Sequence, residues 1–311
     1  MNQYFSWYQG HRHGSHLPFV ILLFLLLLGG WNPVSAAGVD QDGNPIPGGA
    51  PFKRIISLYS AHTENLLAFG LGPELIGVAA GDEDEAVSGL PRFSANDTTE
   101  KFIAAAPDLI LIRPMISQAH PQLVDQLRKA GIAVVSLQPT TVDDMLAYWQ
   151  TLGELSGRAG EAAAMIGKFK GELAAIERVR DAIAVDKRPK VYFESIHARM
   201  KTFAPSSIAV FVLESAGGVN VAADAEARNA TNIAAYGKER ILSHAADIDI
   251  YLAQNGRMNQ VTKELIAQEP GFQAIKAIRA GRICLIDEEL VSRPTSRLLQ
   301  GIKEVRALLY P

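Results

Sequence analysis

The sequence predicts an α/β fold in which two Rossmann-like lobes with parallel central sheets are joined by a single long backbone α-helix, with a ligand cleft between the lobes. Three observations support this class. Short apolar runs alternate with helical segments in both halves of the chain. Several of these runs, such as Leu109 to Ile112, are wholly apolar, which is typical of strands buried on both faces of a parallel sheet. Between the halves, Val142 to Val185 is helical throughout and has no strand pattern.

The N-terminus has the pattern of a cleavable export signal. Leu17 to Leu28 is almost wholly apolar, and Val34-Ser35-Ala36 supplies small residues suited to cleavage after Ala36 or Ala37. The Gly-, Pro- and Asp-rich stretch that follows predicts a flexible leader. The expected organisation is a signal peptide at 1–37, a flexible leader at 38–51, an N-terminal lobe at 52–157, an interlobe helix at 158–187 and a C-terminal lobe at 188–311.

Charge and cysteine usage narrow the function classes. Cleavage removes one basic residue, Arg12, from 30, so 29 basic and 33 acidic residues remain and the net charge is −4. No basic tract is present, which argues against nucleic acid as a partner. The single cysteine, Cys284, lies in an apolar run and is expected to be a buried thiol, without a disulfide or a lipid anchor. We therefore expect a monomer in the periplasm that is not a lipoprotein.

The first lobe follows from apolar runs separated by turns. Gly70 and Gly72 end the first helix, Pro107 ends the second and Gly131 ends the third. Alternation of strands and helices implies parallel pairing with right-handed crossovers. The expected strands are 55–58, 75–79, 109–112 and 133–137, and the later helices are 98–105 and 121–130.

The central helical stretch is expected to break at Gly157. Asp143 and Asp144 suit a helix start, because acidic side chains favour the N-terminal end of the helix dipole. The second half carries one continuous apolar stripe, and its roughly 27 residues would reach about 40 Å. A coiled coil is less favoured, because the run is short and its small residues suit packing on a globular body.

The second lobe repeats the same pattern. Gly217-Gly218 and Gly281 follow two of its helices, as expected at helix ends. The expected strands are 191–194, 248–252 and 282–286. The expected helices are 207–215, one that begins with 239–243, 271–280 and the amphipathic helix 296–309.

The most informative stretch is Arg54 to Val78, which predicts a strand, a polar turn, a helix and a second strand. The turn follows the first strand, and ligands of open α/β sheets bind at the carboxyl ends of the strands. We expect Tyr59, Ser60 and His62 of this turn to line the cleft. The alternative is that Ser60 and Thr63 only cap the following helix while Tyr59 packs locally.

Arginines after other strands are further candidates, because the planar guanidinium pairs with carboxylate or phosphate groups through two hydrogen bonds. The alternative is that these arginines are ordinary solvated side chains, and Arg297 could instead donate to carbonyls of its own loop. The candidates are Arg113, Arg199, Arg293 and Arg297. Four aromatic side chains could stack on a flat ligand, namely Tyr59, Phe93, Phe203 and Tyr236.

Enzyme motifs are absent from the sequence. There is no G-x-S-x-G elbow, no H-E-x-x-H and no glycine-rich phosphate loop opening a helix. The acidic run Asp82-Glu83-Asp84-Glu85 is expected to be a solvated loop. We therefore expect a protein that is not an enzyme, and an exported hydrolase is the remote alternative.

The chain from Phe52 to Pro311 resembles the helix-linked (class III) bacterial solute-binding proteins, the receptors of ABC importers for iron chelates, haem and cobalamin. Four pieces carry the resemblance, in the family's order: RIISLYSAHTENLLAFGLGPELIGV (54–78), KFIAAAPDLILI (101–112), SAGGVNVAAD (215–224), and FQAIKAIRAGRICLID (272–287) followed by SRPTSRLLQGIKEV (292–305).

The resemblance implies capture and delivery of a ligand rather than catalysis. It implies no intrinsic cofactor, a bound metal chelate (ferric siderophore, haem or cobalamin), and an ABC permease dimer with its ATPase subunits as partners. In the family, an acidic residue on each lobe meets arginines of the permease. Glu239 matches that position in the second lobe. In the first lobe Pro121 departs from the pattern, which leaves Asp125 as a weak substitute.

A bare-metal receptor is the main alternative. Related helix-linked zinc and manganese receptors use three histidines and a carboxylate from separate loops, and neutral imidazole suits zinc. The residues of this chain that could form such a set are His62, His120, His197 and Asp287. Scattered polar residues are the alternative interpretation of these four.

Overall fold

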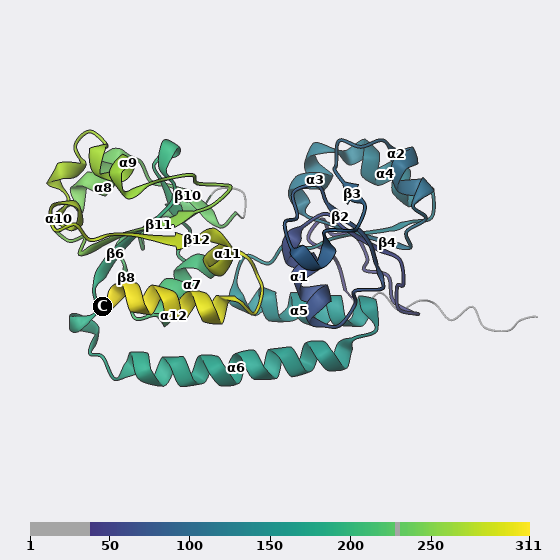
Figure 1. The fold of residues 1–311 in the computed structure, drawn as a ribbon, viewed down its shortest axis with the longest axis horizontal. Coiled ribbons are helices and arrows are strands. Elements are labelled where there is room, and N and C mark those ends of the chain that lie inside the picture. Colours follow the sequence, from purple (N-terminus) through teal and green to yellow (C-terminus); the bar gives the residue numbers. More distant parts are fainter. Residues whose placement is uncertain (1–37, 228–230) are drawn as a thin grey trace, which may run out of the picture. The chain divides into compact units, whose positions relative to one another are not determined.

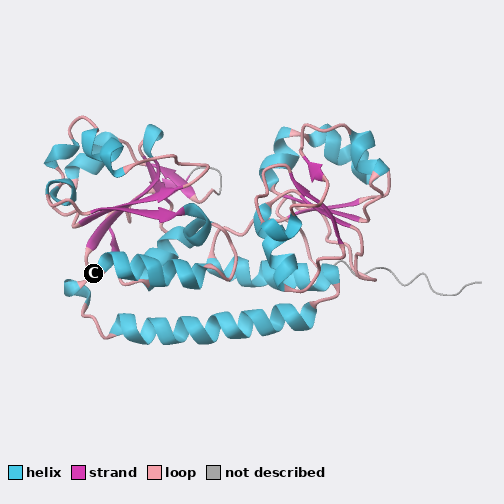
Figure 2. Ribbon diagram, in the orientation of Figure 1, coloured by secondary structure: helices cyan, strands magenta, loops and turns pink. Residues whose placement is uncertain are grey.

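The computed structural model describes residues 38–227 and 231–311, and all of these belong to one compact unit. The expected signal peptide at 1–37 lies outside the described residues. Among the described residues, no helix is both long and apolar enough to cross a bilayer. Two α/β lobes are present, each built around its own sheet, as Figures 1 and 2 show.

The described residues of the first lobe form a five-stranded sheet in the order β3-β2-β1-β4-β5. Every neighbouring pair is parallel, as the strand–helix alternation predicts. All four residues of the apolar strand β4 are buried, because helices cover both faces of the sheet. The strands are β1 (Ile55–Ser57), β2 (Leu75–Ala79), β3 (Arg92–Phe93), β4 (Leu109–Ile112) and β5 (Ala133–Ser136).

The helices of the first lobe begin directly after strands or short turns. Proline occupies the first turn of α3 and of α4, where its missing N–H costs no hydrogen bond. The first of these two helices was not expected from the sequence. The helical elements are α1 (Ser60–Ala68), η1 (Glu85–Val87), α2 (Thr99–Ala104), α3 (Pro114–Ala119) and α4 (Pro121–Lys129).

The segment 38–51, expected to be a flexible leader, instead packs on the first lobe. Ile46 is 4% exposed, and the carboxylate of Asp40 is 5% exposed. One oxygen of Asp40 accepts hydrogen bonds from the backbone N–H groups of Asp42 and Asn44, and the other accepts one from Ser136 in β5. Asp40 belongs to the polar composition that predicted a flexible leader, but its carboxylate ties the segment to the sheet.

Two helices form the middle of the chain, α5 (Val142–Ser156) and α6 (Ala159–Asp181). Gly157 separates them with a φ of 72°, a conformation that glycine adopts without strain. The 23 residues of α6 reach about 35 Å at 1.5 Å per residue. In Figure 1, α6 runs along α5 and the terminal helix, so that it follows both lobes.

The second sheet is mixed rather than wholly parallel. Its parallel centre consists of β12, β11, β6 and β8, and an antiparallel edge of β7, β10 and β9 extends it. The edge strands are short and were not expected from the sequence. The strands are β6 (Lys190–Ile196), β7 (Lys201–Phe203), β8 (Val219–Asn220), β9 (Glu226–Ala227), β10 (Ile233–Ala235), β11 (Ile250–Asn255) and β12 (Ile283–Asp287).

The expected helix at 271–280 is in fact two short pieces, because Ile275 between them is extended. Three further elements, η3, α9 and α11, lie where no helix was expected. The helical elements of the second lobe are η2 (Val185–Lys187), η3 (His197–Arg199), α7 (Ile208–Ser215), α8 (Lys238–Ser243), α9 (Lys263–Gln268), η4 (Phe272–Ala274), α10 (Lys276–Arg279), α11 (Glu288–Ser292) and α12 (Leu298–Leu309).

One hydrophobic core runs beneath both lobes. It joins Leu66 of α1, Trp149 of α5, Phe169 of α6 and Leu298 of α12, all at most 1% exposed. The rings of Trp149 and Phe169 meet edge to face, with centroids 5.3 Å apart. The lobes are therefore connected by packed side chains as well as by the chain itself.

Candidate functional site

The cleft between the lobes has a volume of about 450 Å³, within the range of roughly 300–1,000 Å³ usual for small-molecule sites. Both lobes contribute to it, and each does so from the carboxyl ends of its parallel strands, where ligands of α/β sheets bind. The residues that line it are Leu58, Tyr59, Ser60, Ala79, Gly81, Arg113, Gln254, Arg257, Met258, Glu288, Ser292 and Arg293.

On the first-lobe wall, Tyr59 follows β1 and Arg113 follows β4. These strands are parallel neighbours, so their carboxyl ends bring the two side chains together. The guanidinium carbon of Arg113 lies 4.3 Å from the centroid of the Tyr59 ring, a cation–π contact. An Arg113 amino nitrogen also contacts the sulfur of Met115 at 2.9 Å. This arrangement places a phenol and a cation side by side at the cleft surface.

Burial raises the pKa of the Tyr59 hydroxyl, because a phenolate would lose hydration. The positive charges of Arg113 and Arg293 act in the opposite direction. The phenol is therefore protonated at neutral pH and can donate a hydrogen bond to a ligand. Neither Ser60 nor Thr63 caps α1, since the helix has no side-chain cap and the Thr63 hydroxyl donates to Ser57.

On the second-lobe wall, the loop after β11 supplies Gln254, Arg257 and Met258. Arg257 extends across the cleft, and its guanidinium donates a 2.6 Å hydrogen bond to the carbonyl of Gly81, which follows β2 in the first lobe. Asn259 holds this loop from behind. The side-chain NH2 of Asn259 donates to the backbone carbonyl of Gln254 at 2.8 Å. The backbone carbonyl of Asn259 accepts from the N–H of Gly256 at 3.1 Å.

Helix α11, which follows β12, supplies Glu288 from its first position and Ser292 from its last, and Arg293 follows the helix directly. A Glu288 carboxylate oxygen accepts the N–H of Met258 at 2.9 Å, so the two second-lobe loops are tied together. Ser292 donates to the buried Gln254 at 2.6 Å. Arg293 pairs with the carboxylate of Glu289 at 2.6 Å and shares this carboxylate with Arg297.

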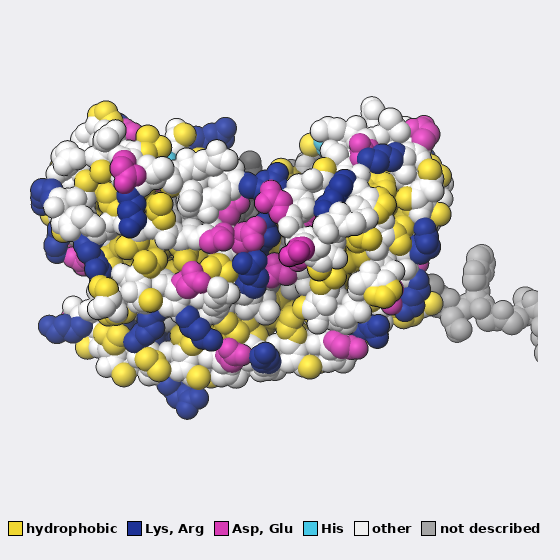
Figure 3. Space-filling view, viewed as in Figure 1, with side chains coloured by type: hydrophobic (Ala, Val, Ile, Leu, Met, Phe, Trp, Pro, Cys, Tyr) yellow, Lys and Arg dark blue, Asp and Glu magenta, His cyan; other side chains and the backbone are white. Residues whose placement is uncertain are grey.

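Three guanidinium groups and one carboxylate, that of Glu288, are the charged groups of the cleft lining. In Figure 3, basic and acidic side chains gather where the two lobes face each other. Positive charge on low-dielectric walls concentrates anions. The arrangement can therefore bind and orient an anionic molecule.

His62 is not part of the cleft, contrary to expectation, because its imidazole is 0% exposed. Its Nε2 donates to the carbonyl of Ile112 at 3.2 Å, and its Nδ1 accepts from the Tyr148 hydroxyl at 2.7 Å. Burial is the main cause that lowers the pKa of His62 from 6.5 to about 3. The ring is a neutral structural group of the first-lobe core.

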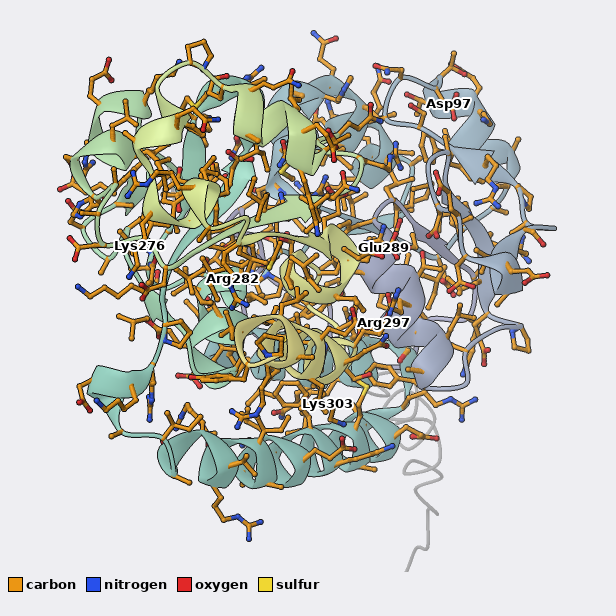
Figure 4. All side chains as sticks on the ribbon, turned by 60° about the vertical axis from the view of Figure 1, so that its left-hand side comes forward. Asp97, Lys276, Arg282, Glu289, Arg297 and Lys303 are labelled. Atoms are coloured by element: carbon orange, nitrogen blue, oxygen red, sulfur yellow. The ribbon has the colours of Figure 1, made fainter. Side chains whose placement is uncertain are left out.

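Arg297 also lies outside the cleft lining. It pairs with Glu289 at 3.0 Å and, across the lobe boundary, with Glu64 of α1 at 3.9 Å. Figure 4 labels Glu289 and Arg297, which lie between α12 and the first lobe. The carbonyl of Pro294 accepts two more interlobe bonds, from Asn65 and from Trp149, both at 3.0 Å. We call residues 293–297 the interlobe loop.

Two further expected ligand residues lie elsewhere in the second lobe. Arg199 is exposed on η3 and is not part of the cleft lining. Tyr236 is 6% exposed, and its hydroxyl donates to Asp224 at 3.0 Å. Its ring face is occupied by the guanidinium of Arg240, 4.3 Å from the centroid. Neither side chain faces the cleft.

The residues of the bare-metal alternative do not come together. Within the described part of the chain, no group of three or more His, Cys, Asp or Glu side chains is placed to hold a metal ion. The Nδ1 of His197 is hydrogen-bonded to the fully buried Glu194 at 2.9 Å. His120 lies at the junction of α3 and α4, and Asp287 caps α11.

The two expected docking residues differ in their surroundings. Glu239 is exposed in the first turn of α8. Asp125 lies in the middle of α4 and pairs with Lys129 at 2.7 Å.

The second-lobe loop after β11 is a part of the cleft that the sequence pattern did not predict. Its composition, Asn255-Gly256-Arg257-Met258-Asn259, is a polar, glycine-containing turn directly after a buried strand. The same rule that selected Tyr59 would have selected it. The expected strand ended at Leu252, three residues too early to reveal the loop.

Comparison with known proteins places this geometry in a family context. A family profile described as periplasmic binding protein matches residues 55–290, which includes the first wall of the cleft and, from the second wall, Gln254, Arg257, Met258 and Glu288.

Individual relatives agree with this match. The chain is 26% identical over 265 residues to YvrC of Bacillus subtilis (strain 168), described as an uncharacterized ABC transporter substrate-binding lipoprotein, with 83% of this chain and 80% of that protein covered. It is 23% identical to a cobalamin-binding protein of Halobacterium salinarum, with 80% and 67% covered. A solved structure from Staphylococcus epidermidis, described as a possible iron-binding periplasmic solute-binding protein, has a TM-score of 0.72 at 25% identity, covering 84% of this chain and all (100%) of that one.

Proposed function

We propose that this chain, which belongs to the periplasmic binding protein family and is the substrate-binding component of an ABC transporter, captures a metal chelate outside the cytoplasm and delivers it to the permease. The ligand is an iron chelate (ferric siderophore or haem) or cobalamin. Relatives described as cobalamin-binding and as possibly iron-binding support this range of ligands.

One observation carries the proposal, namely that a single cleft is lined from the carboxyl ends of strands in both lobes. A solute held there contacts both walls at once, as Tyr59 and Arg113 face Arg257 and Arg293. These groups are suited to holding a ligand by charge-assisted hydrogen bonds, and they make no nucleophile–base pair of the kind hydrolases use. The relatives are solute-binding proteins, which also supports binding rather than catalysis.

Delivery requires a contact between the receptor and the permease, and we assign Glu239 to it in the second lobe. Helix α8, which carries Glu239, precedes β11, and the short helix α2 precedes β4 in the same way. The residues just before β4 and β11 correspond as well. Asp108 before β4 accepts backbone N–H groups of Lys53 and Arg54, and Asp249 before β11 accepts that of Lys190.

This correspondence points to Glu100 as the first-lobe counterpart. Glu100 is exposed in the first turn of α2, as Glu239 is in α8. In Figure 1, α2 and α8 lie on the side of their lobes opposite to α6. Asp125 is less suited, because Lys129 already neutralises it. We therefore prefer Glu100 to Asp125 for first-lobe docking.

Thermal unfolding of the purified mature chain tests the ligand class. The measurement is repeated with ferric siderophores, haem, cobalamin, Zn²⁺ and Mn²⁺, each in excess. A ligand at 100 times its Kd adds about 2.7 kcal/mol to the free energy of unfolding. We expect stabilisation by a chelate. Stabilisation by bare zinc or manganese alone would contradict the proposal, and turnover of an ester or peptide substrate would favour the hydrolase alternative.

A further inference from the structure

The arginines of the cleft differ in how far their charge is already satisfied. Arg293 pairs with Glu289, but neither Arg113 nor Arg257 forms an ion pair with any carboxylate of the described residues. The two stand on opposite walls, since Arg113 follows β4 of the first lobe and Arg257 follows β11 of the second. The cleft therefore offers one uncompensated cation from each side.

Both cations have only neutral partners within the described structure. Arg113 lies over the Tyr59 ring and touches a thioether sulfur, and its buried Nε has no hydrogen-bond partner there. Arg257 donates to the neutral carbonyl of Gly81. An anionic oxygen adds a direct Coulomb attraction to the guanidinium that a neutral carbonyl or sulfur does not supply. An anionic oxygen would therefore be preferred at both positions.

The lining gives little support to a flat macrocycle. Tyr59 is its single aromatic residue, and the face of that ring already carries the Arg113 guanidinium. Phe93, Phe203 and Tyr236, which could have served for stacking, are at most 6% exposed and lie in hydrophobic cores. Haem and corrinoid rings would thus meet guanidinium and amide groups rather than an aromatic surface.

We infer that the cleft selects a compact, polyanionic chelate of iron(III) with oxygen donors, held by Arg113 on one wall and Arg257 on the other. This inference rests on the proposed function and narrows its ligand. The Tyr59 hydroxyl and Gln254 supply neutral hydrogen bonds around the chelate. Glu288, fixed by the N–H of Met258, disfavours an anionic group beside it and so fixes the orientation of the ligand.

The test compares probes of different charge by isothermal titration of the purified chain. The anionic probes are ferric enterobactin and ferric citrate, the neutral probe is ferrichrome, the cationic probe is ferrioxamine B, and haemin and cyanocobalamin are the macrocycles. We expect at least one anionic chelate to bind ten or more times tighter than ferrichrome. Its affinity should also fall as salt is added, because salt screens exposed charge pairs.

Charge-removing variants locate the effect. Arg113→Gln and Arg257→Gln should each weaken binding of the anionic chelate at least tenfold, and this loss should be several times larger than any loss of ferrichrome affinity. Arg178→Gln, on the exposed surface of α6, is the matched control and should change neither affinity.

Two kinds of failure are distinguishable. If ferrichrome, ferrioxamine B, haemin or cyanocobalamin binds as tightly as every anionic chelate, or if both arginine variants retain full affinity, the inference is overturned while the receptor function stands. If no chelate binds and bare zinc does, the proposed function itself is overturned, and this inference with it.

Discussion

At the scale of single residues, the core of the first lobe holds a chain of polar groups with a fixed proton order. Asn65 donates to the Tyr148 hydroxyl, Tyr148 donates to Nδ1 of His62, and Nε2 of His62 donates to the Ile112 carbonyl. Each of these side chains is at most 3% exposed. A proton added to His62 would leave Tyr148 facing a second donor, so the neutral imidazole is the form that the fold requires.

His62 should make stability depend on pH. Its pKa is about 3 in the folded state and about 6.5 in an unfolded chain, so the unfolded chain binds the proton first. The stabilisation is complete above pH 6.5 and is lost as the pH falls from 6.5 toward 3, at about 1.4 kcal/mol per pH unit.

The variant His62→Gln tests this pH dependence. Its amide can still donate to Ile112 and accept from Tyr148, but it does not titrate. Urea unfolding between pH 7.5 and 4.5 should give a shallower loss of stability for His62→Gln than for the natural chain. His120→Gln, at the partly exposed α3–α4 junction, is the control and should keep the natural slope. Equal slopes in all three proteins would contradict the assignment.

The same residues show what the sequence could and could not reveal. Tyr59, Ser60, Arg113 and Arg293 were found because each follows a strand or helix end at the cleft edge. His62 occupies the same turn, but its partner Tyr148 is 86 positions away in sequence. No local pattern distinguishes an imidazole that faces solvent from one that accepts a bond from a distant helix.

At the scale of elements, the interlobe loop joins the lobes through one carbonyl. Pro294 accepts from Asn65 of α1 and Trp149 of α5, so either donor alone still satisfies it. Glu64 adds a bond with Thr295, although burial raises the pKa of the Glu64 carboxyl. The loop that presents Arg293 to the cleft is therefore anchored to the opposite lobe.

A double-mutant cycle should reveal this redundancy. Trp149→Phe keeps most of the ring packing and removes one donor, and Asn65→Ala removes the other. Trp149→Phe should cost about 1 kcal/mol through its lost hydrogen bond, and Asn65→Ala should cost more, because Asn65 also donates to the Ala61 carbonyl and the Tyr148 hydroxyl. The double variant leaves the buried Pro294 carbonyl unpaired and should add a penalty of about 1–3 kcal/mol beyond the sum of the two. Denaturant unfolding measures all four proteins. Strictly additive losses would mean that the carbonyl finds another partner.

Glycines in two helices offer a matched pair of substitutions. A Cβ at Gly301 of α12 would lie 2.0 Å from the Leu290 carbonyl of α11, whereas a Cβ at Gly167 of α6 would meet nothing within 4 Å. Gly301→Ala should destabilise by about 1–3 kcal/mol and weaken ligand binding, because α11 carries Glu288 and Ser292.

Gly167→Ala should instead stabilise by about 0.5–1 kcal/mol, because alanine loses less entropy in a helix. Thermal unfolding and ligand titration of both variants check the pair. A Gly301→Ala protein with natural stability would show that α11 and α12 are free to separate.

Element boundaries show the same division between local and distant causes. Strands β2 and β4 match the expected ranges, because short runs rich in apolar residues, each preceded closely by a proline, define them locally. The antiparallel edge of the second sheet was missed, because β7, β9 and β10 are two or three residues long and depend on partners for their conformation. The leader was misjudged because Asp40 finds its partner in β5, 96 residues away.

At the scale of the whole molecule, the proposed docking residues stand apart from the cleft. Neither Glu100 nor Glu239 belongs to the cleft lining, and both side chains are exposed. Binding and delivery should therefore be separable by mutation.

Glu100→Ala and Glu239→Ala should each leave ligand affinity unchanged and reduce transport by the assembled importer, because each removes one carboxylate available to permease arginines. Affinity is measured by titration, and transport by ligand uptake in reconstituted vesicles. Glu161→Ala, in α6 on the opposite side, is the control. If Glu100→Ala keeps full transport and Asp125→Ala loses it, Asp125 rather than Glu100 is the first-lobe docking residue.

The anchoring of the interlobe loop also bears on how the protein could be used as a sensor. Because Pro294 holds the second lobe against α1 and α5, a pair of dyes on the two lobes would change separation little when ligand arrives. A single environment-sensitive dye at the cleft mouth is the better reporter, and Met258, 49% exposed, offers its attachment point as Met258→Cys. Cys284 is the one native cysteine of the chain, so replacing it would leave the thiol introduced by Met258→Cys as the one site of labelling.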